Sequence, residues 1–216
     1  METAHTTEPP SGVVDDILRE YEARAAEEER QIAQAYESNT MGQRRDEFLL
    51  AVGRSTATVL HILAAEAGAT RLLEVGSSYG YSTIWLAHAA RITGGKLTSL
   101  EKQPSKVAYA RERLERAGLA SYVDFRVGDA LESLAALDGP FDFVLLDLWK
   151  DLYVPCFDLI YPKLSPGGII VADNILFPES SRPMAERYQA HVRQQRGLET
   201  VLLPIGSGIE ITRKQS

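Results

Sequence analysis

The stretch RLLEVGSSYGYS, residues 71–82, joins a short apolar run to a turn that contains two glycines. Such a run, followed at once by helix-forming sequence, predicts a buried strand, a turn and a helix. Glycine lets the backbone turn tightly and brings amide groups close to a bound ligand. The dinucleotide-binding pattern G-x-G-x-x-G has a second glycine two residues after the first, where this chain has Ser78. This difference disfavours a cofactor that contains a pyrophosphate.

The alternation of apolar runs and helical stretches continues downstream. The further strand-like runs lie at 96–101, 123–128, 141–147 and 167–173, and the helical stretches at about 81–92, 104–117, 130–136, 151–163 and 179–196. This rhythm predicts an α/β fold with βαβ units, a mostly parallel sheet and helices on both faces. Two final runs within 199–214, joined at Gly206-Ser207-Gly208, predict an antiparallel hairpin at a sheet edge, which brings the number of strands to seven.

Helical sequence also precedes the first strand. Residues 13–37 are rich in Ala, Glu, Arg and Gln and lack Pro and Gly, and a second helix is expected over 44–67, ending at Gly68. Residues 1–12 are polar and are expected to form a flexible tail. The chain is interpreted as one domain over 13–216, with N-terminal helices at 13–68 and an α/β core at 69–216.

Composition narrows the class of protein. Of 216 residues, 44% are hydrophobic, which is enough for one sizeable core. No apolar run reaches the roughly 18 residues that span a bilayer, and the N-terminal sequence does not resemble a signal peptide, so a cytoplasmic protein is expected. A net charge of −7 and a pI near 5.2 oppose binding to nucleic acid.

The single cysteine and four scattered histidines give no Cys/His zinc pattern. Cys156 is expected to be a small buried apolar group. His61, His88 and His191 are expected at the surface or at the edge of the core.

Acidic residues end the second and third strand-like runs. Glu101 ends LTSLE, where a carboxylate can accept hydrogen bonds from both hydroxyls of a ribose. The alternative is an exposed carboxylate at a strand end. Asp129 follows the third run and either contacts an adenine amino group or caps the next helix.

Oxygen-bearing residues also end the fourth and fifth runs. Asp147 ends FDFVLLD, and Asp173 with Asn174 ends GGIIVADN. If these strands are adjacent, the side chains converge at the carboxyl edge of the sheet as hard ligands of the kind that Mg²⁺ prefers. The alternative for the Asp-Asn pair is a turn. Lys150 lies three residues beyond Asp147. It either belongs to this cluster or is exposed and paired with Asp151 or with a carboxylate of the cofactor.

Together these motifs resemble the cation-dependent O-methyltransferases, the family of catechol and caffeoyl-CoA O-methyltransferases. The resemblance rests on LLEVGSSYGYS, LTSLEKQP, LLDLWKDLY and VADNILFP and covers about residues 50–213. It implies a Rossmann-like fold that binds S-adenosylmethionine (SAM), with Mg²⁺ or another divalent cation. The implied reaction transfers the SAM methyl group to a hydroxyl of a small catechol-like acceptor, and the implied assembly is a homodimer.

The resemblance also implies roles for individual residues. Lys150 corresponds to the family's general base, and Asp147, Asp173 and Asn174 to its metal ligands. Trp149 and Pro178 would flank the acceptor, next to Lys150 and Asn174. The residues implied in cofactor binding are Val52, Gly53, Glu74, Gly76, Ser78, Ser82, Glu101, Asp129, Ala130, Asp147 and Trp149. Val201 aligns where the family's catechol enzymes have a glutamate on the substrate side.

Two other functions compete with this interpretation. A nicotinamide-dependent oxidoreductase would share the fold and Glu101, but it has no need for the cluster of Asp147, Asp173 and Asn174. A non-catalytic SAM-binding protein would share the fold, but it has no need for Lys150. Binding of SAM without binding of NAD would exclude the first, and turnover that depends on Mg²⁺ would exclude the second.

Overall fold

The structure of the protein, a computed structural model, describes residues 8–215, except for the side chain of Arg45. Of the tail expected at residues 1–12, residues 1–7 lie outside the described part. Pro10 is buried, and α1 begins at Val13, as the sequence predicts.

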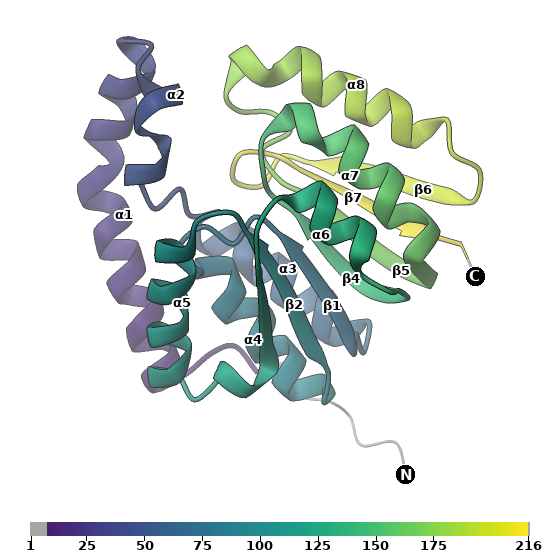
Figure 1. Cartoon of the computed structure of the whole chain (residues 1–216), viewed down its shortest axis with the longest axis horizontal. Coiled ribbons are helices and arrows are strands. Elements are labelled where there is room, and N and C mark those ends of the chain that lie inside the picture. Colours follow the sequence, from purple (N-terminus) through teal and green to yellow (C-terminus); the bar gives the residue numbers. More distant parts are fainter. Residues whose placement is uncertain (1–7, 216) are drawn as a thin grey trace.

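Seven strands form a single sheet in the order β3-β2-β1-β4-β5-β7-β6 (Figure 1). The strands are β1 (Arg71–Val75), β2 (Lys96–Glu101), β3 (Val123–Val127), β4 (Phe141–Leu146), β5 (Leu164–Ala172), β6 (Leu198–Leu203) and β7 (Ile209–Lys214). The first five are parallel, whereas β7 runs antiparallel to both β5 and β6. The mostly parallel sheet and its antiparallel C-terminal hairpin are therefore confirmed, and the hairpin places β6 at one of the two edges of the sheet.

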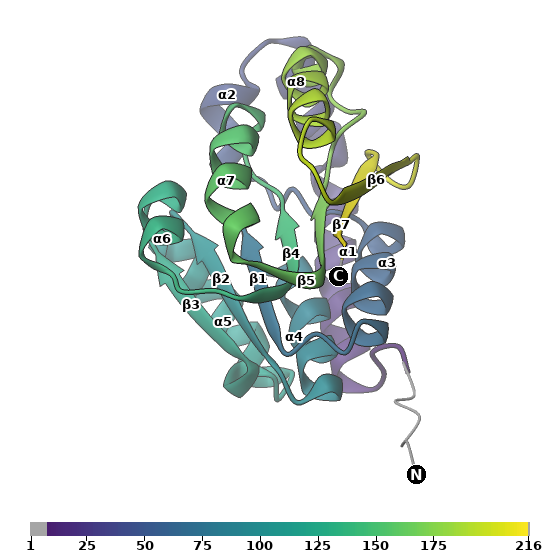
Figure 2. The ribbon, with the colours of Figure 1, turned by 90° about the vertical axis from the view of Figure 1, so that its right-hand side faces the viewer.

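Helices cover both faces of the sheet (Figures 1 and 2). The α-helices are α1 (Val13–Glu37), α2 (Met41–Arg44), α3 (Arg54–Glu66), α4 (Tyr81–Thr93), α5 (Pro104–Arg116), α6 (Ala130–Ala136), α7 (Tyr153–Ile160) and α8 (Arg182–Arg193). Short 3₁₀ turns are η1 (Arg45–Glu47), η2 (Ala120–Tyr122), η3 (Lys150–Leu152), η4 (Tyr161–Lys163) and η5 (Glu179–Ser181). Apolar side chains of α6, α7 and α8 pack on one face, and those of α3 and α4 on the other.

The helix α1 packs outside this second layer, against α4 and α5. Its buried stripe consists of Val14, Ile17, Leu18 and Tyr21, at helical spacing. The Tyr21 hydroxyl donates to the carbonyl oxygen of Tyr79 at 2.6 Å, in the turn after β1. This contact fixes the N-terminal helix to the turn that precedes α4.

The single helix expected over 44–67 is wrong. Extended chain at 48–53 separates η1 from α3, and Leu50 and Gly53 have left-handed φ angles of 48° and 81°. The Leu49 amide donates to Glu28 of α1 at 2.7 Å, and its carbonyl oxygen accepts from the Ser78 hydroxyl at 3.1 Å. These tertiary bonds replace helical ones, so helix-forming composition does not decide the structure here.

Of the three histidines that were expected at the surface or at the edge of the core, two are instead buried. His61 on α3 and His88 on α4 are only 1% and 4% exposed, and their rings share a hydrogen bond of 2.9 Å. Burial lowers the pKa of each imidazole to about 4, so both are neutral near pH 7. His191 is partly exposed and pairs with Asp158, and Cys156 is buried as expected.

Within residues 8–215, no helix combines the length and apolar character needed to cross a bilayer.

Candidate active site

A cavity of about 930 Å³ opens at the carboxyl ends of the parallel strands. The chain runs from β1 to β2 and β3 on one side and continues with β4 and β5 on the other, so β1 and β4 flank the point where strand order reverses. Open α/β sheets bind ligands at this crevice, because the loops on its two sides diverge there. The predicted site residues that line the cavity are Gly76, Ser78, Glu101, Asp129, Ala130, Asp147, Trp149, Lys150, Asn174 and Pro178.

Gly76, the first glycine of the turn after β1, lines the cavity. Its φ angle is 95°, and a Cβ at this position would overlap the carbonyl oxygen of Asp147. Only glycine combines this φ with such a close approach. The turn therefore brings β1 and β4 together at the site.

Glu101 is half-buried and held by two backbone amides. Its Oε2 accepts from the Ser78 amide and its Oε1 from the Gln103 amide, each at 2.9 Å. Each carboxylate oxygen retains a further lone pair that can accept from a hydroxyl. This environment differs from the exposed strand end considered as an alternative, and it suits the predicted contact with a ribose.

Asp129 caps α6 and lies at the cavity at the same time. Its Oδ1 accepts from the amides of Leu131 at 2.9 Å and Glu132 at 3.2 Å. The capping alternative is therefore correct. Because Asp129 and Ala130 also line the cavity, a contact with a ligand remains compatible with the cap.

Two predicted cofactor residues lie behind the cavity wall. Glu74 is fully buried, and its carboxylate accepts from the hydroxyls of Ser82, Thr83 and Ser99 at 2.6–2.7 Å. Burial raises the pKa of Glu74 to about 7, while the three donors oppose this shift. Neither Glu74 nor Ser82 lines the cavity. In this arrangement they join β1, β2 and α4 beneath the glycine turn.

The extended segment at 48–53 forms part of the opposite wall. Leu49, Leu50 and Ala51 line the cavity, while Val52 and Gly53, the residues expected there, follow directly after them. The segment is tied to the glycine turn, because the Ser78 hydroxyl donates to the carbonyl oxygen of Leu49.

The acidic cluster at the ends of β4 and β5 forms as the sequence predicts. Asp147 lies at the end of β4 and Asp173 at the end of β5, next to Asn174, whose φ is 53°. Asp173 is completely buried and its Oδ1 has no hydrogen-bond partner, while its Oδ2 accepts from the side-chain Nδ2 of Asn174 at 3.3 Å. Burial raises the pKa of both carboxyls.

Lys150 is buried beside these carboxylates, at 8% exposure. Its Nζ donates to the Tyr153 hydroxyl at 2.6 Å, and that hydroxyl donates to the carbonyl oxygen of Asp173 at 2.9 Å. Burial lowers the pKa of Lys150 to about 8, and the charges of Asp147 and Asp173 oppose this shift. The alternative of an exposed lysine is wrong, and the lowered pKa makes the neutral amine more accessible than in an ordinary lysine.

The donor set fits a hard cation. An unpartnered buried carboxylate oxygen costs free energy that a cation would recover. Among the described residues, no group of three or more His, Cys, Asp and Glu side chains is arranged to hold a metal ion. A cation here would have the carboxylates of Asp147 and Asp173 and the amide oxygen of Asn174 as its protein ligands, and water or the acceptor would supply further oxygens.

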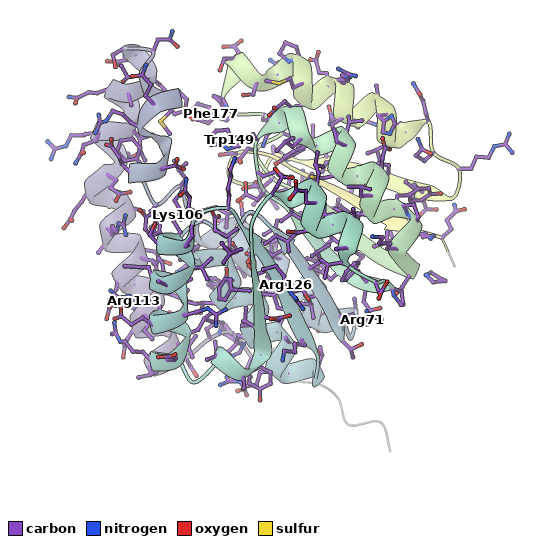
Figure 3. All side chains as sticks on the ribbon, viewed as in Figure 1. Arg71, Lys106, Arg113, Arg126, Trp149 and Phe177 are labelled. Atoms are coloured by element: carbon purple, nitrogen blue, oxygen red, sulfur yellow. The ribbon has the colours of Figure 1, made fainter. Side chains whose placement is uncertain are left out.

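Aromatic and apolar side chains lie beyond this cluster. Trp149 is 44% exposed and Phe177 is 54% exposed, and Figure 3 shows both at the opening between α2 and α8. Pro178 follows Phe177 and also lines the cavity. Val201 lies on the edge strand β6, is half-exposed and does not line the cavity.

Sequence reasoning missed several residues in and around the cavity. Tyr153 does not line the cavity but accepts from Lys150 Nζ, and its spacing of three from Lys150 is one at which side chains in a helical turn can meet. Lys106, Tyr36 and Phe177 reach the cavity from three separate segments, and local sequence gives no sign of their meeting.

The chain matches the model of an O-methyltransferase family over residues 22–215. It is 37% identical over 131 residues to a catechol O-methyltransferase of Niastella koreensis, an alignment that covers 59% of each chain. It is 39% identical over 128 residues to a catechol O-methyltransferase of Mycobacterium tuberculosis, covering 59% of this chain and 58% of the relative. The alignments thus span less than two thirds of these relatives.

Solved structures agree with the fold. The O-methyltransferase TomG of Streptomyces achromogenes, in complex with SAM, superposes with a TM-score of 0.71 and 28% identity over 83% of this chain and 89% of that one. The fold is therefore the Rossmann-like fold of SAM-binding methyltransferases. Within that class, the chain belongs to the O-methyltransferase family, as its motifs indicate. This membership opposes the nicotinamide-dependent alternative.

Proposed function

We propose that the protein is a Mg²⁺-dependent O-methyltransferase that transfers the SAM methyl group to one hydroxyl of a small catechol-like acceptor. One observation carries the proposal: Asp147, Lys150 and Asn174 line the same cavity as Gly76 and Glu101, and Asp173 is buried close to Lys150 and Asp147. Residues suited to hold a nucleoside, Gly76 and Glu101, therefore lie in the same cavity as groups that can promote loss of a hydroxyl proton. Membership of the family and the names of the relatives support this reading.

The predicted roles follow from this geometry. Glu101 accepts from the ribose hydroxyls of SAM, and the turn at Gly76 leaves room for the rest of the cofactor. Asp147, Asp173 and Asn174 would hold the cation, which when bound would supply Lewis acidity to vicinal oxygens of the acceptor. Trp149 and Pro178 flank the acceptor ring. Alignment of the acceptor oxygen with the S–CH₃ bond by the site as a whole can contribute roughly 7–11 kcal/mol to lowering the barrier.

Lys150 is the base in this proposal. Neutral Nζ takes the proton of the acceptor hydroxyl, and the resulting oxyanion attacks the methyl carbon in line with the breaking S–CH₃ bond. Tyr153 holds Nζ in place through its 2.6 Å hydrogen bond. The products are the methyl ether, S-adenosylhomocysteine and a protonated lysine, which returns its proton to water.

The test is transfer from methyl-labelled SAM to catechol, caffeic acid and dihydroxybenzoates, with Mg²⁺ and with EDTA. Transfer that EDTA abolishes and Mg²⁺ restores is the expected result. Transfer that persists in EDTA would contradict the role of the cation. Absence of transfer in both conditions, with SAM binding intact by calorimetry, would favour the non-catalytic alternative. The cytoplasmic location and the homodimer remain predictions.

A further inference from the structure

The outer part of the cavity has a distinct apolar lining. Beyond Lys150 and Asn174, the wall consists of side chains from α1, α2, the 48–53 segment, the loop after β5 and α8: Ile32, Tyr36, Met41, Leu50, Phe177 and Met184. Tyr36, Phe177 and Met184 are 37%, 54% and 38% exposed. Exposed apolar side chains gathered in a concave site favour an apolar ligand, because binding removes their surface from water.

Tyr36 and Phe177 close this wall across the cavity. Their rings meet edge to face, with centroids 5.8 Å apart and planes at 72°. Tyr36 lies in the last turn of α1, while Phe177 directly precedes Pro178, the residue expected to flank the acceptor ring. An acceptor held at Pro178 therefore has the aromatic pair as its next neighbour on this side.

Charge on the α1 side of the cavity is negative. Glu28 and Glu29 line it about two helical turns before Tyr36. Glu28 is already engaged by Arg24 at 2.7 Å and by the Leu49 amide at 2.7 Å, whereas Glu29 is exposed. A carboxylate on the acceptor near this wall would meet like charge, which disfavours its binding.

We propose that Tyr36 and Phe177 determine acceptor specificity. The preferred acceptor is an aromatic ring with two adjacent hydroxyl groups and an uncharged apolar substituent. This inference rests on the proposed function and names the substrate class within it. The substituent packs against the two rings and displaces water from them. A buried methylene contributes about a fourfold factor in affinity, so a partly buried propyl group is expected to raise kcat/KM about tenfold.

The experiment compares catechol, 4-propylcatechol and 3,4-dihydroxybenzoate as acceptors. For the wild-type protein, kcat/KM is expected to be about tenfold higher for the propyl compound than for catechol, and lowest for the carboxylate. In Tyr36→Ala and Phe177→Ala, the ratio of propyl compound to catechol is expected to fall to about two. Tyr36→Phe keeps the ring and is expected to keep the ratio. Val201→Ala, which removes an equally exposed apolar side chain outside the cavity, is the matched control.

Binding of the same compounds to the protein loaded with Mg²⁺ and S-adenosylhomocysteine, measured by calorimetry, separates this inference from the proposed function. Equal affinities for catechol and 4-propylcatechol would overturn the inference even if methyl transfer occurs. A preference for the propyl compound that disappears in Phe177→Ala would support it even if no transfer is detected. Circular dichroism and SAM binding check that each variant is folded.

Discussion

Lys150 is the residue on which the proposed chemistry depends. Its Nζ is buried, bonded to Tyr153 and close to two carboxylates, which is the setting of a lysine that can act as a base. We expect Lys150→Ala to lower kcat about 100- to 10,000-fold, the usual effect of losing a general base, with SAM affinity unchanged. Labelled methyl transfer and calorimetry measure the two quantities. Lys96→Ala is the control, because Lys96 begins β2 at the end of the strand away from Glu101 and the cavity. Undiminished turnover in Lys150→Ala would exclude Lys150 as the base.

Gly76 can be tested against a second glycine of similar backbone conformation. Gly76 and Gly94 have φ angles of 95° and 69°, but a Cβ at Gly94 would meet nothing within 4 Å. We expect Gly94→Ala to lower the free energy of unfolding by about 1–2 kcal/mol through backbone strain alone. Gly76→Ala should cost about 1–3 kcal/mol more because of the overlap with Asp147. Equal losses of unfolding free energy in the two variants, measured by urea denaturation, would show that the approach of Gly76 to the Asp147 carbonyl does not require glycine.

Among the elements, α3 and α4 are joined by a buried histidine pair that makes stability depend on pH. The folded-state pKa values of His61 and His88 are about 4, below their ordinary value of 6.5, so the unfolded chain binds more protons between these limits. Their contribution to stability is therefore complete above pH 6.5 and is lost as the pH falls toward 4. We expect a loss of at least about 1 kcal/mol between pH 6.5 and 4.5.

A variant with glutamine at both positions provides the control for this pH dependence, because glutamine forms hydrogen bonds but does not titrate. Urea denaturation of both proteins over pH 4.5–7.5 isolates the histidine contribution as a difference. Identical profiles for the two proteins would indicate that the His61 and His88 rings are not the source of the pH dependence of stability.

Most elements could be predicted from sequence because local pattern decides them. The runs at 71–76 and 141–147 are buried on both faces, so apolar content alone marks them as parallel strands. The 48–53 segment could not be predicted, because distant residues, Glu28 and Ser78, bond its main chain. The candidate site divides in the same way. The cluster of Asp147, Asp173 and Lys150 could be predicted because these residues lie at or just after strand ends. The apolar outer wall could not, because it forms only where α1 meets the loop after β5.

The cavity is lined both by the N-terminal segments and by residues at the carboxyl ends of the parallel strands, so a bound ligand would connect the two parts of the molecule. SAM at 100 times its dissociation constant is expected to raise the free energy of unfolding by about 2.7 kcal/mol. Because the 48–53 segment lines the cavity, SAM should also slow proteolysis between α2 and α3 more than cleavage near the hairpin of β6 and β7. Mass spectrometry of timed digests measures both rates. Equal protection at the two places would show that the segment is not coupled to the ligand.

The position of β7 inside the sheet has a consequence for how the site is assembled during translation. The amides of Ile175 and Leu176 donate to the carbonyl oxygens of Gly208 and Ser207 at 2.9 Å, so the chain that follows Asn174 is held by residues made near the end of synthesis. The glycine turn and Glu101 belong to strands that emerge from the ribosome much earlier. A nascent chain can therefore form the turn and strand end proposed to hold the nucleoside first, whereas the part of the site proposed to hold the acceptor is completed only when the last hairpin pairs with β5.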